Sequence, residues 1–249
     1  MQVIRVDDLA IRIPNVPSRY RANCAKEYGQ FVHGETAKMT ALQVKEAGLM
    51  KGQFVEMALC WTDNRILTFK PNYINEPFQE IWGIPTAGEM KEQFGDKCSE
   101  LSTFLLHRQS KDKLQHLVES FSRNAFIQWV NEGMPGDPED YALSKMKDLY
   151  LGSIFRFEFV QTESDYGPYF YVQVSKKVAT TPFELAALNA ARQIYQMQLN
   201  GEGVCTDLRL LDNEAQCLSQ TVNTETVDTD LKLVNPAKNG KRKSLAPSK

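Results

Sequence analysis

The chain has 249 residues, of which 42% are hydrophobic and 24% charged, and its formal net charge is −2 at pH 7. This length supports a sizeable core without disulfides, and the near-zero charge excludes the global basic field of many DNA-binding proteins. Asp7 and Asp8 stand where a signal peptide needs an apolar stretch, and no run of roughly 18 apolar residues occurs. We therefore expect a cytoplasmic protein with no membrane partner.

The N-terminal part predicts short strands and one hairpin. Residues 29–34 predict a strand between two glycines, and residues 40–49 a short helix. Residues 53–61 alternate as a strand, Asp63 and Asn64 predict a turn, and residues 65–70 return. A loop is expected next, because it holds three prolines, Pro71, Pro77 and Pro85.

The middle of the chain predicts helices. Apolar residues recur at helical spacing from Leu101 to Ala125, and the polar residues 108–112 favour a division into two helices. Residues 133–138 contain two glycines and two prolines and predict a loop, and a short helix is expected over residues 141–150.

An aromatic hairpin is the clearest strand signal. Residues 154–160 and 169–174 alternate with period two on either side of a turn at Asp165 to Pro168. Alternation puts Phe155, Phe157 and Phe159 on one face, which we assign to the core. The hairpins predict an α+β fold with an antiparallel sheet that has an OB-like arrangement as one option.

A capped helix follows the aromatic hairpin. Thr181 is the predicted N-cap, Pro182 stands at the first helical position, Glu184 completes a capping box and Gly201 ends the helix. Residues 1–200 are therefore expected to form one α+β domain. Residues 201–235 are acidic and residues 236–249 basic, and we expect this tail to be largely disordered.

Catalytic and metal-binding motifs are weak. No phosphate-binding, dinucleotide, zinc-protease or serine-hydrolase motif occurs. His107 and His116 are nine residues apart, which is wrong for a helical zinc pair, and the five cysteines form no C-x-x-C. We therefore lean away from an enzyme and expect no metal or cofactor. Four residues resemble the spacing of a metal-dependent nuclease, which stays a third alternative: Glu56, Asp63, Glu89 and Lys91.

The aromatic hairpin also carries the leading functional hypothesis. Tyr169 and Tyr171 share the face opposite the phenylalanines, with Arg156 on the neighbouring strand. Tyrosines flanked by cations are typical of single-strand binders, in which bases stack on rings and phosphates meet the cations. The alternative is that the two tyrosines lie under a neighbouring helix, for which the helix capped by Thr181 is the candidate, and only pack.

We therefore predict a non-enzymatic protein that binds single-stranded nucleic acid. The expected binding residues are the aromatic and basic groups of both hairpins and of the tail: Trp61, Arg65, Lys70, Tyr73, Arg156, Tyr169, Tyr171, Lys176, Lys177, Lys241, Arg242 and Lys243. The alternative is an assembly subunit whose exposed aromatic residues meet a protein partner or a second copy of the chain.

Overall fold

The computed structural model describes residues 1–24, 29–33, 43, 46–48, 53–69, 73–92 and 94–201. They form the predicted α+β class of fold, dominated by strands. The expectation of a purely antiparallel sheet is wrong, because Ser18–Cys24 pairs with Ser102–His107 in parallel and the sheet is mixed. The predicted helix over residues 40–49 falls largely, and the predicted tail almost wholly, outside this part of the chain.

Two sheets carry the fold. A small sheet has the order β1-β2-β7, formed by β1 (Gln2–Val6), β2 (Leu9–Ile13) and β7 (Cys98–Glu100). The large sheet has seven strands in the order β10-β9-β5-β6-β8-β3-β4. Its strands are β3 (Ser18–Cys24), β4 (Gly29–His33), β5 (Phe54–Phe69), β6 (Tyr73–Ala87), β8 (Ser102–His107), β9 (Ile154–Ser164) and β10 (Gly167–Lys177).

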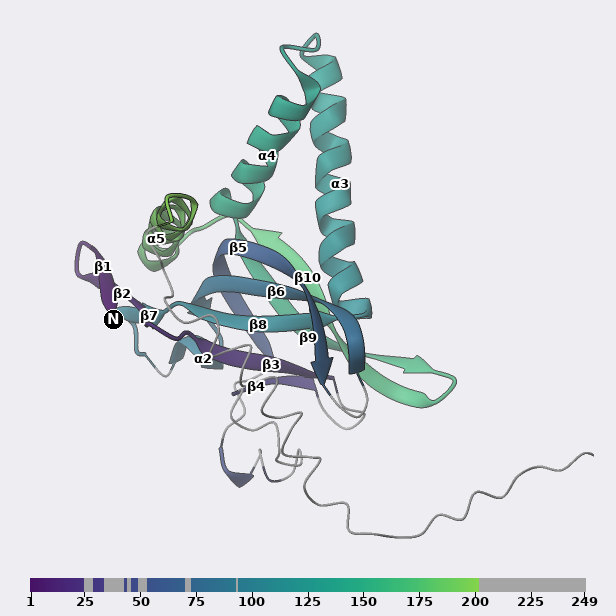
Figure 1. The fold of residues 1–249 in the computed structure, drawn as a ribbon. Helices are drawn as coiled ribbons and strands as arrows, with labels where there is room; N and C mark the ends of the chain where they lie inside the picture. Colours follow the sequence, from purple (N-terminus) through teal and green to yellow (C-terminus); the bar gives the residue numbers. More distant parts are fainter. Residues whose placement is uncertain are drawn as a thin grey trace, which may run out of the picture.

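The large sheet curls into a half-barrel (Figure 1). Its two ends approach each other, because β4 lies against β9. A Cβ added to Gly29 would stand 2.5 Å from the Cδ1 of Phe159, so glycine is required at this contact. The inner face buries Tyr20, Phe31, Phe104 and Phe157 in one core.

Among the described helices, α2 (Glu89–Glu92) is a single turn and three others are longer. The helices α3 (Gln109–Asn131) and α4 (Pro138–Gly152) form a hairpin that rises from the barrel (Figure 1). Leu114 and Leu149 anchor this hairpin in the inner core. Helix α5 (Pro182–Leu199) packs on the outer face, where Leu188 and Ile194 meet Trp82 in a second core.

The predicted helix over residues 101–105 is wrong. Ser102–His107 is strand β8, and α3 begins at Gln109, inside the polar segment that was expected to separate two helices. Phe104 and Leu106 are buried in the inner core, which is the period-two pattern of a strand. Apolar residues here satisfy both periods, and pairing with β6 and β3 decides between them.

The first predicted hairpin has its turn in the wrong place. β5 continues without a break through Asp63 and Asn64, and β6 occupies the expected proline loop. The prolines are tolerated because β6 pairs with β8 only from Phe78 to Gly83. Pro77 and Pro85 lie outside this paired stretch, so their missing backbone N–H groups cost no hydrogen bond to β8. A register shift in the β5–β6 pairing also adjoins Pro85.

The aromatic hairpin and the capped helix are confirmed. β9 and β10 pair in antiparallel register, with Phe159 opposite Val172 and Phe157 opposite Val174. Thr181 caps α5 in a reciprocal capping box with Glu184, and the short strand predicted from Gly29 is β4.

Candidate nucleic-acid interface

Alternation along the aromatic hairpin places its side chains as expected. Phe155, Phe157 and Phe159 are buried in the inner core, whereas Tyr169 and Tyr171 lie on the opposite face and are half-buried. α5 packs on β5 and β6, and it is the beginning of α3 that contacts the two tyrosines. The neighbouring helix of the packing alternative is therefore α3 and not the Thr181-capped helix α5.

The first turns of α3 lie beside the edge strand β10 in space. The Tyr169 hydroxyl donates to Oε1 of Gln109 at 2.6 Å. The Val172 N–H, on the open edge of the sheet, donates to Oγ of Ser110 at 3.0 Å. The Tyr169 side chain is thus held by α3, and an edge donor that would otherwise be exposed, the Val172 N–H, is satisfied.

A cation lies over the second tyrosine. Lys113 Nζ stands 5.1 Å from the ring centroid of Tyr171, within cation–π range. Within the described part of the chain Lys113 forms no ion pair, so its charge is not compensated by a carboxylate. The helix contributes this cation, and sequence reasoning did not select it.

A row of aromatic residues on the outer face of the sheet ends next to the start of α3. Arg65 on β5 is the register partner of Phe78 on β6, and Phe78 is in turn the partner of His107 on β8. The rings of Phe78 and His107 stack with centroids 4.4 Å apart. The chain then passes directly from His107 into Arg108 and Gln109, which contacts Tyr169.

The junction between β8 and α3 is strained. Arg108 has φ 47° and ψ −127°, a conformation that glycine adopts far more readily than any residue with a Cβ. Its side chain is 66% exposed, and its guanidinium lies 3.6 Å from Glu76, which also contacts His107. An observed outlier of this kind is a reason to look for function at the junction.

These residues surround the junction of β8 and α3 and are here named the β8–α3 surface: Arg65, Phe78, His107, Arg108, Lys113, Tyr169 and Tyr171. Phe78 is buried beneath this surface and is 7% exposed. Three of its members were expected, namely Arg65, Tyr169 and Tyr171. Phe78 was missed because its segment was assigned to a loop. His107 and Arg108 were missed because the segment that begins at Leu101 was assigned to helix, and a strand over residues 102–107 was the signal that would have found them. Lys113 lies in a helix as expected, and its place over Tyr171 depends on how α3 meets β10.

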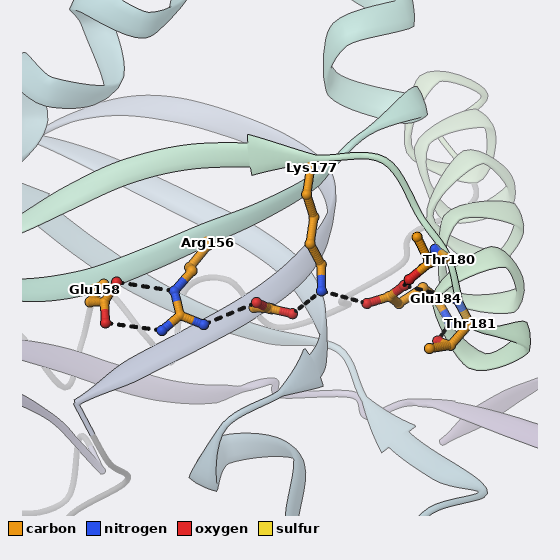
Figure 2. Close-up of polar contacts among 7 residues, drawn as sticks. Arg156, Glu158, Lys177, Thr180, Thr181 and Glu184 are labelled. Carbon is orange, nitrogen blue, oxygen red and sulfur yellow. Dashed lines mark hydrogen bonds and ion pairs between the residues drawn. The ribbon is translucent and has the colours of Figure 1, made fainter.

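Arg156 and Lys177 belong to a separate network of ion pairs (Figure 2). Arg156 makes two hydrogen bonds to Glu158, at 2.9 and 3.1 Å, and one to Glu56 at 3.0 Å. Lys177 Nζ contacts Glu56 at 2.5 Å and Glu184 at 2.8 Å. With three carboxylates for two cations, this network offers no net positive charge to a phosphate.

Glu184 links this network to the cap of α5. Its Oε2 accepts from the backbone N–H groups of Thr180 and Thr181, at 2.7 and 3.0 Å. Burial raises the pKa of Glu184, but the hydrogen bonds from Lys177 and from these two N–H groups outweigh it and hold the pKa at about 2. The network therefore fastens α5 to β5 and β10.

Two of the remaining predicted residues, Trp61 and Lys176, lie apart from the β8–α3 surface. Trp61 stacks on Trp82 with centroids 4.9 Å apart and lines a pocket beside α4. Lys176 lies over the ring of Phe121, further along α3. The other five have no described side chain, namely Lys70, Tyr73, Lys241, Arg242 and Lys243.

The nuclease alternative needs a group of metal ligands, and no group of three potential ligands comes together among the described residues. Glu56 is held between Arg156 and Lys177. Lys91 is buried, donates to the Gly95 carbonyl and lies over the ring of Phe183, and burial lowers its pKa. The side chain of Glu89 is outside the description.

Comparison with protein-family models, with curated proteins and with solved structures finds no match for this chain. Among the described helices, none combines the length and the apolar character needed to cross a membrane. The geometry of the β8–α3 surface is therefore what points to a function.

Proposed function

We propose that this protein binds single-stranded nucleic acid, without catalysis, on the β8–α3 surface. The observation that carries the proposal is the pair of half-buried tyrosines, Tyr169 and Tyr171, held at the start of α3 with Lys113 over the ring of Tyr171. Successive bases stack on such rings, while Arg108 and Lys113 meet the phosphates. A curled sheet that uses its outer face in this way is an OB-like platform.

The charges around the surface favour single strands over duplexes. Glu76 and Glu80 compensate part of the charge of Arg108 and Arg65, so the surface has no strong positive field. Duplex binders depend on many phosphate contacts, whereas unpaired bases gain affinity by stacking. We expect micromolar affinity, little sequence preference and a cytoplasmic site of action.

The decisive experiment compares two tyrosines in fluorescence-anisotropy titrations with labelled single-stranded oligonucleotides. Tyr171→Ala should weaken binding by about 1–3 kcal/mol, the usual contribution of one stacked base. Tyr166→Ala is the matched control, because Tyr166 lies at the turn of the same hairpin and is 86% exposed. This control should retain wild-type affinity.

Two results would contradict the proposal. One is wild-type protein that fails to retard a single strand at micromolar concentration in low salt. The other is a Tyr171→Ala variant with a lower melting temperature and unchanged affinity, which would assign Tyr171 to packing against α3 alone.

A second candidate function is self-assembly, favoured by the tip of the helical hairpin. Large apolar side chains are exposed there on α3 and in the loop beyond it: Phe126, Ile127, Val130 and Met134. A soluble monomer rarely exposes a contiguous group of this kind. Light scattering after size-exclusion chromatography tests for a dimer, which the double variant Phe126→Ser, Ile127→Ser should abolish.

A further inference from the structure

A pocket of about 230 Å³ is lined by residues of β5, α4 and α5. Figure 1 shows these three elements on the side of the sheet away from the start of α3. The lining includes Trp61, Thr62, Leu143, Lys147, Tyr150 and Tyr195. The proposed function uses none of the residues that shape this pocket.

The pocket offers a flat aromatic platform. Trp82 is buried and stacks on Trp61 with an interplanar angle of 18°, so one ring fixes the orientation of the other. Tyr150 and Tyr195 add two further rings to the lining. A rigid group of aromatic rings favours a planar ligand, since offset stacking adds to the burial of apolar area.

The polar groups of the pocket are few and lie at separate points. A hydrogen bond joins the side chains of Tyr150 and Thr62, and burial raises the pKa of Tyr150 in spite of that bond, so its hydroxyl is neutral. Lys147 is the one charged residue in the lining, and within the described residues it forms no ion pair. Apolar walls with a few placed polar groups are typical of small-molecule sites.

We propose that this pocket binds a small planar aromatic anion, with its ring against Trp61 and its acidic group at Lys147. The volume fits one or two fused rings. The stacked tryptophans supply the platform, and Lys147 supplies the charge complementarity. The site is independent of nucleic-acid binding, because Tyr169 and Tyr171 lie at α3 and not in this lining.

The test is a saturation-transfer NMR titration of the full chain with 2-naphthoate and with its neutral analogue 2-naphthalenemethanol. Ligands of this size bind with Kd on the order of 1 mM. Lys147→Glu should weaken 2-naphthoate about three- to fivefold, as expected for one exposed ion pair, and leave the neutral analogue unchanged. Lys145→Glu is the matched control, because Lys145 is on the same helix and outside the lining.

A third variant tests the location. Leu143 is 57% exposed at the rim, so Leu143→Trp should fill the pocket without disturbing the core and reduce binding of both ligands at least about tenfold. Trp61→Leu removes the platform and should have the same effect, with melting curves as the check on folding for both variants.

Three outcomes would overturn the proposal. The first is the absence of saturation transfer to 2-naphthoate at about 5 mM. The second is 2-naphthoate binding that survives both Leu143→Trp and Trp61→Leu in folded protein. The third is an equal loss of 2-naphthoate affinity in Lys147→Glu and Lys145→Glu. Loss of oligonucleotide binding in Tyr171→Ala with unchanged 2-naphthoate binding would separate this site from the proposed nucleic-acid interface.

Discussion

Glu184 shows how one buried carboxylate joins several elements. It completes the capping box of α5 and forms an ion pair with Lys177 at the end of β10. Lys177 also forms an ion pair with Glu56 on β5. The capping box is visible in the sequence, because cap and glutamate are three residues apart. The ion pair is not, because it depends on how the strand and the helix approach each other.

The low pKa of Glu184 predicts an acid-sensitive contribution to stability. Its folded-state pKa is about 2, below the ordinary 4.5, so the contribution is complete above pH 4.5 and is lost as the pH falls through 2. Its size should be about 1–2 kcal/mol, less than the pKa difference implies, because Lys177 is partly exposed and water screens the pair.

Urea unfolding between pH 5 and pH 2 measures this contribution. Glu184→Gln should lower stability at pH 6 and flatten the pH dependence. An unchanged pH profile in the variant would mean that Glu184 is not the group that titrates.

Arg108 gives a second prediction at the scale of one residue. Arg108→Gly should raise the free energy of unfolding by about 1 kcal/mol, because glycine adopts the positive φ without strain. The same variant should bind oligonucleotides more weakly, since it removes a cation from the β8–α3 surface.

Arg108→Ala separates these two effects. It retains a Cβ and therefore the strain, but it lacks the charge, so affinity should fall without a gain in stability. If Arg108→Gly and Arg108→Ala have equal stability, the backbone strain at the junction is not real.

At the scale of elements, α5 depends on its cap. Thr181→Ala should destabilise the protein by about 1 kcal/mol, because the Glu184 N–H loses its acceptor, the Thr181 hydroxyl. Thr181→Ser retains the oxygen and should remain within a few tenths of a kcal/mol of wild type. Chemical denaturation measures both, and equal losses in the two variants would contradict the role of the cap.

The elements also show where local pattern is sufficient. The capped helix and the aromatic hairpin agree with the sequence, because their signals lie within a few residues of each other. The predictions of a turn at Asp63–Asn64 and of a helix near Phe104 are wrong for the opposite reason. Each of those segments is held by neighbouring strands that are distant in sequence, and that pairing overrides a local turn or helical spacing.

At the scale of the whole molecule, the curl of the large sheet depends on close contact between its ends. Gly29→Ala should destabilise the protein by about 1–3 kcal/mol, because the new Cβ meets the ring of Phe159. Phe159→Leu should relieve part of that clash, so the double variant should lose less than the sum of the two single losses. Additive losses in denaturation experiments would show that the two ends do not touch.

The sequence by itself determined the α+β class, the aromatic hairpin, the core assignment of its phenylalanines and the cap of α5. Those features follow from residue periodicity and from contacts within a few positions. Only the tertiary structure decided that Arg65, His107 and Lys113 lie along one surface with Tyr169 and Tyr171, and that Arg156 and Lys177 are held by carboxylates. The physical reason is that strand order and sheet curvature bring these residues together, and neither is encoded in local spacing.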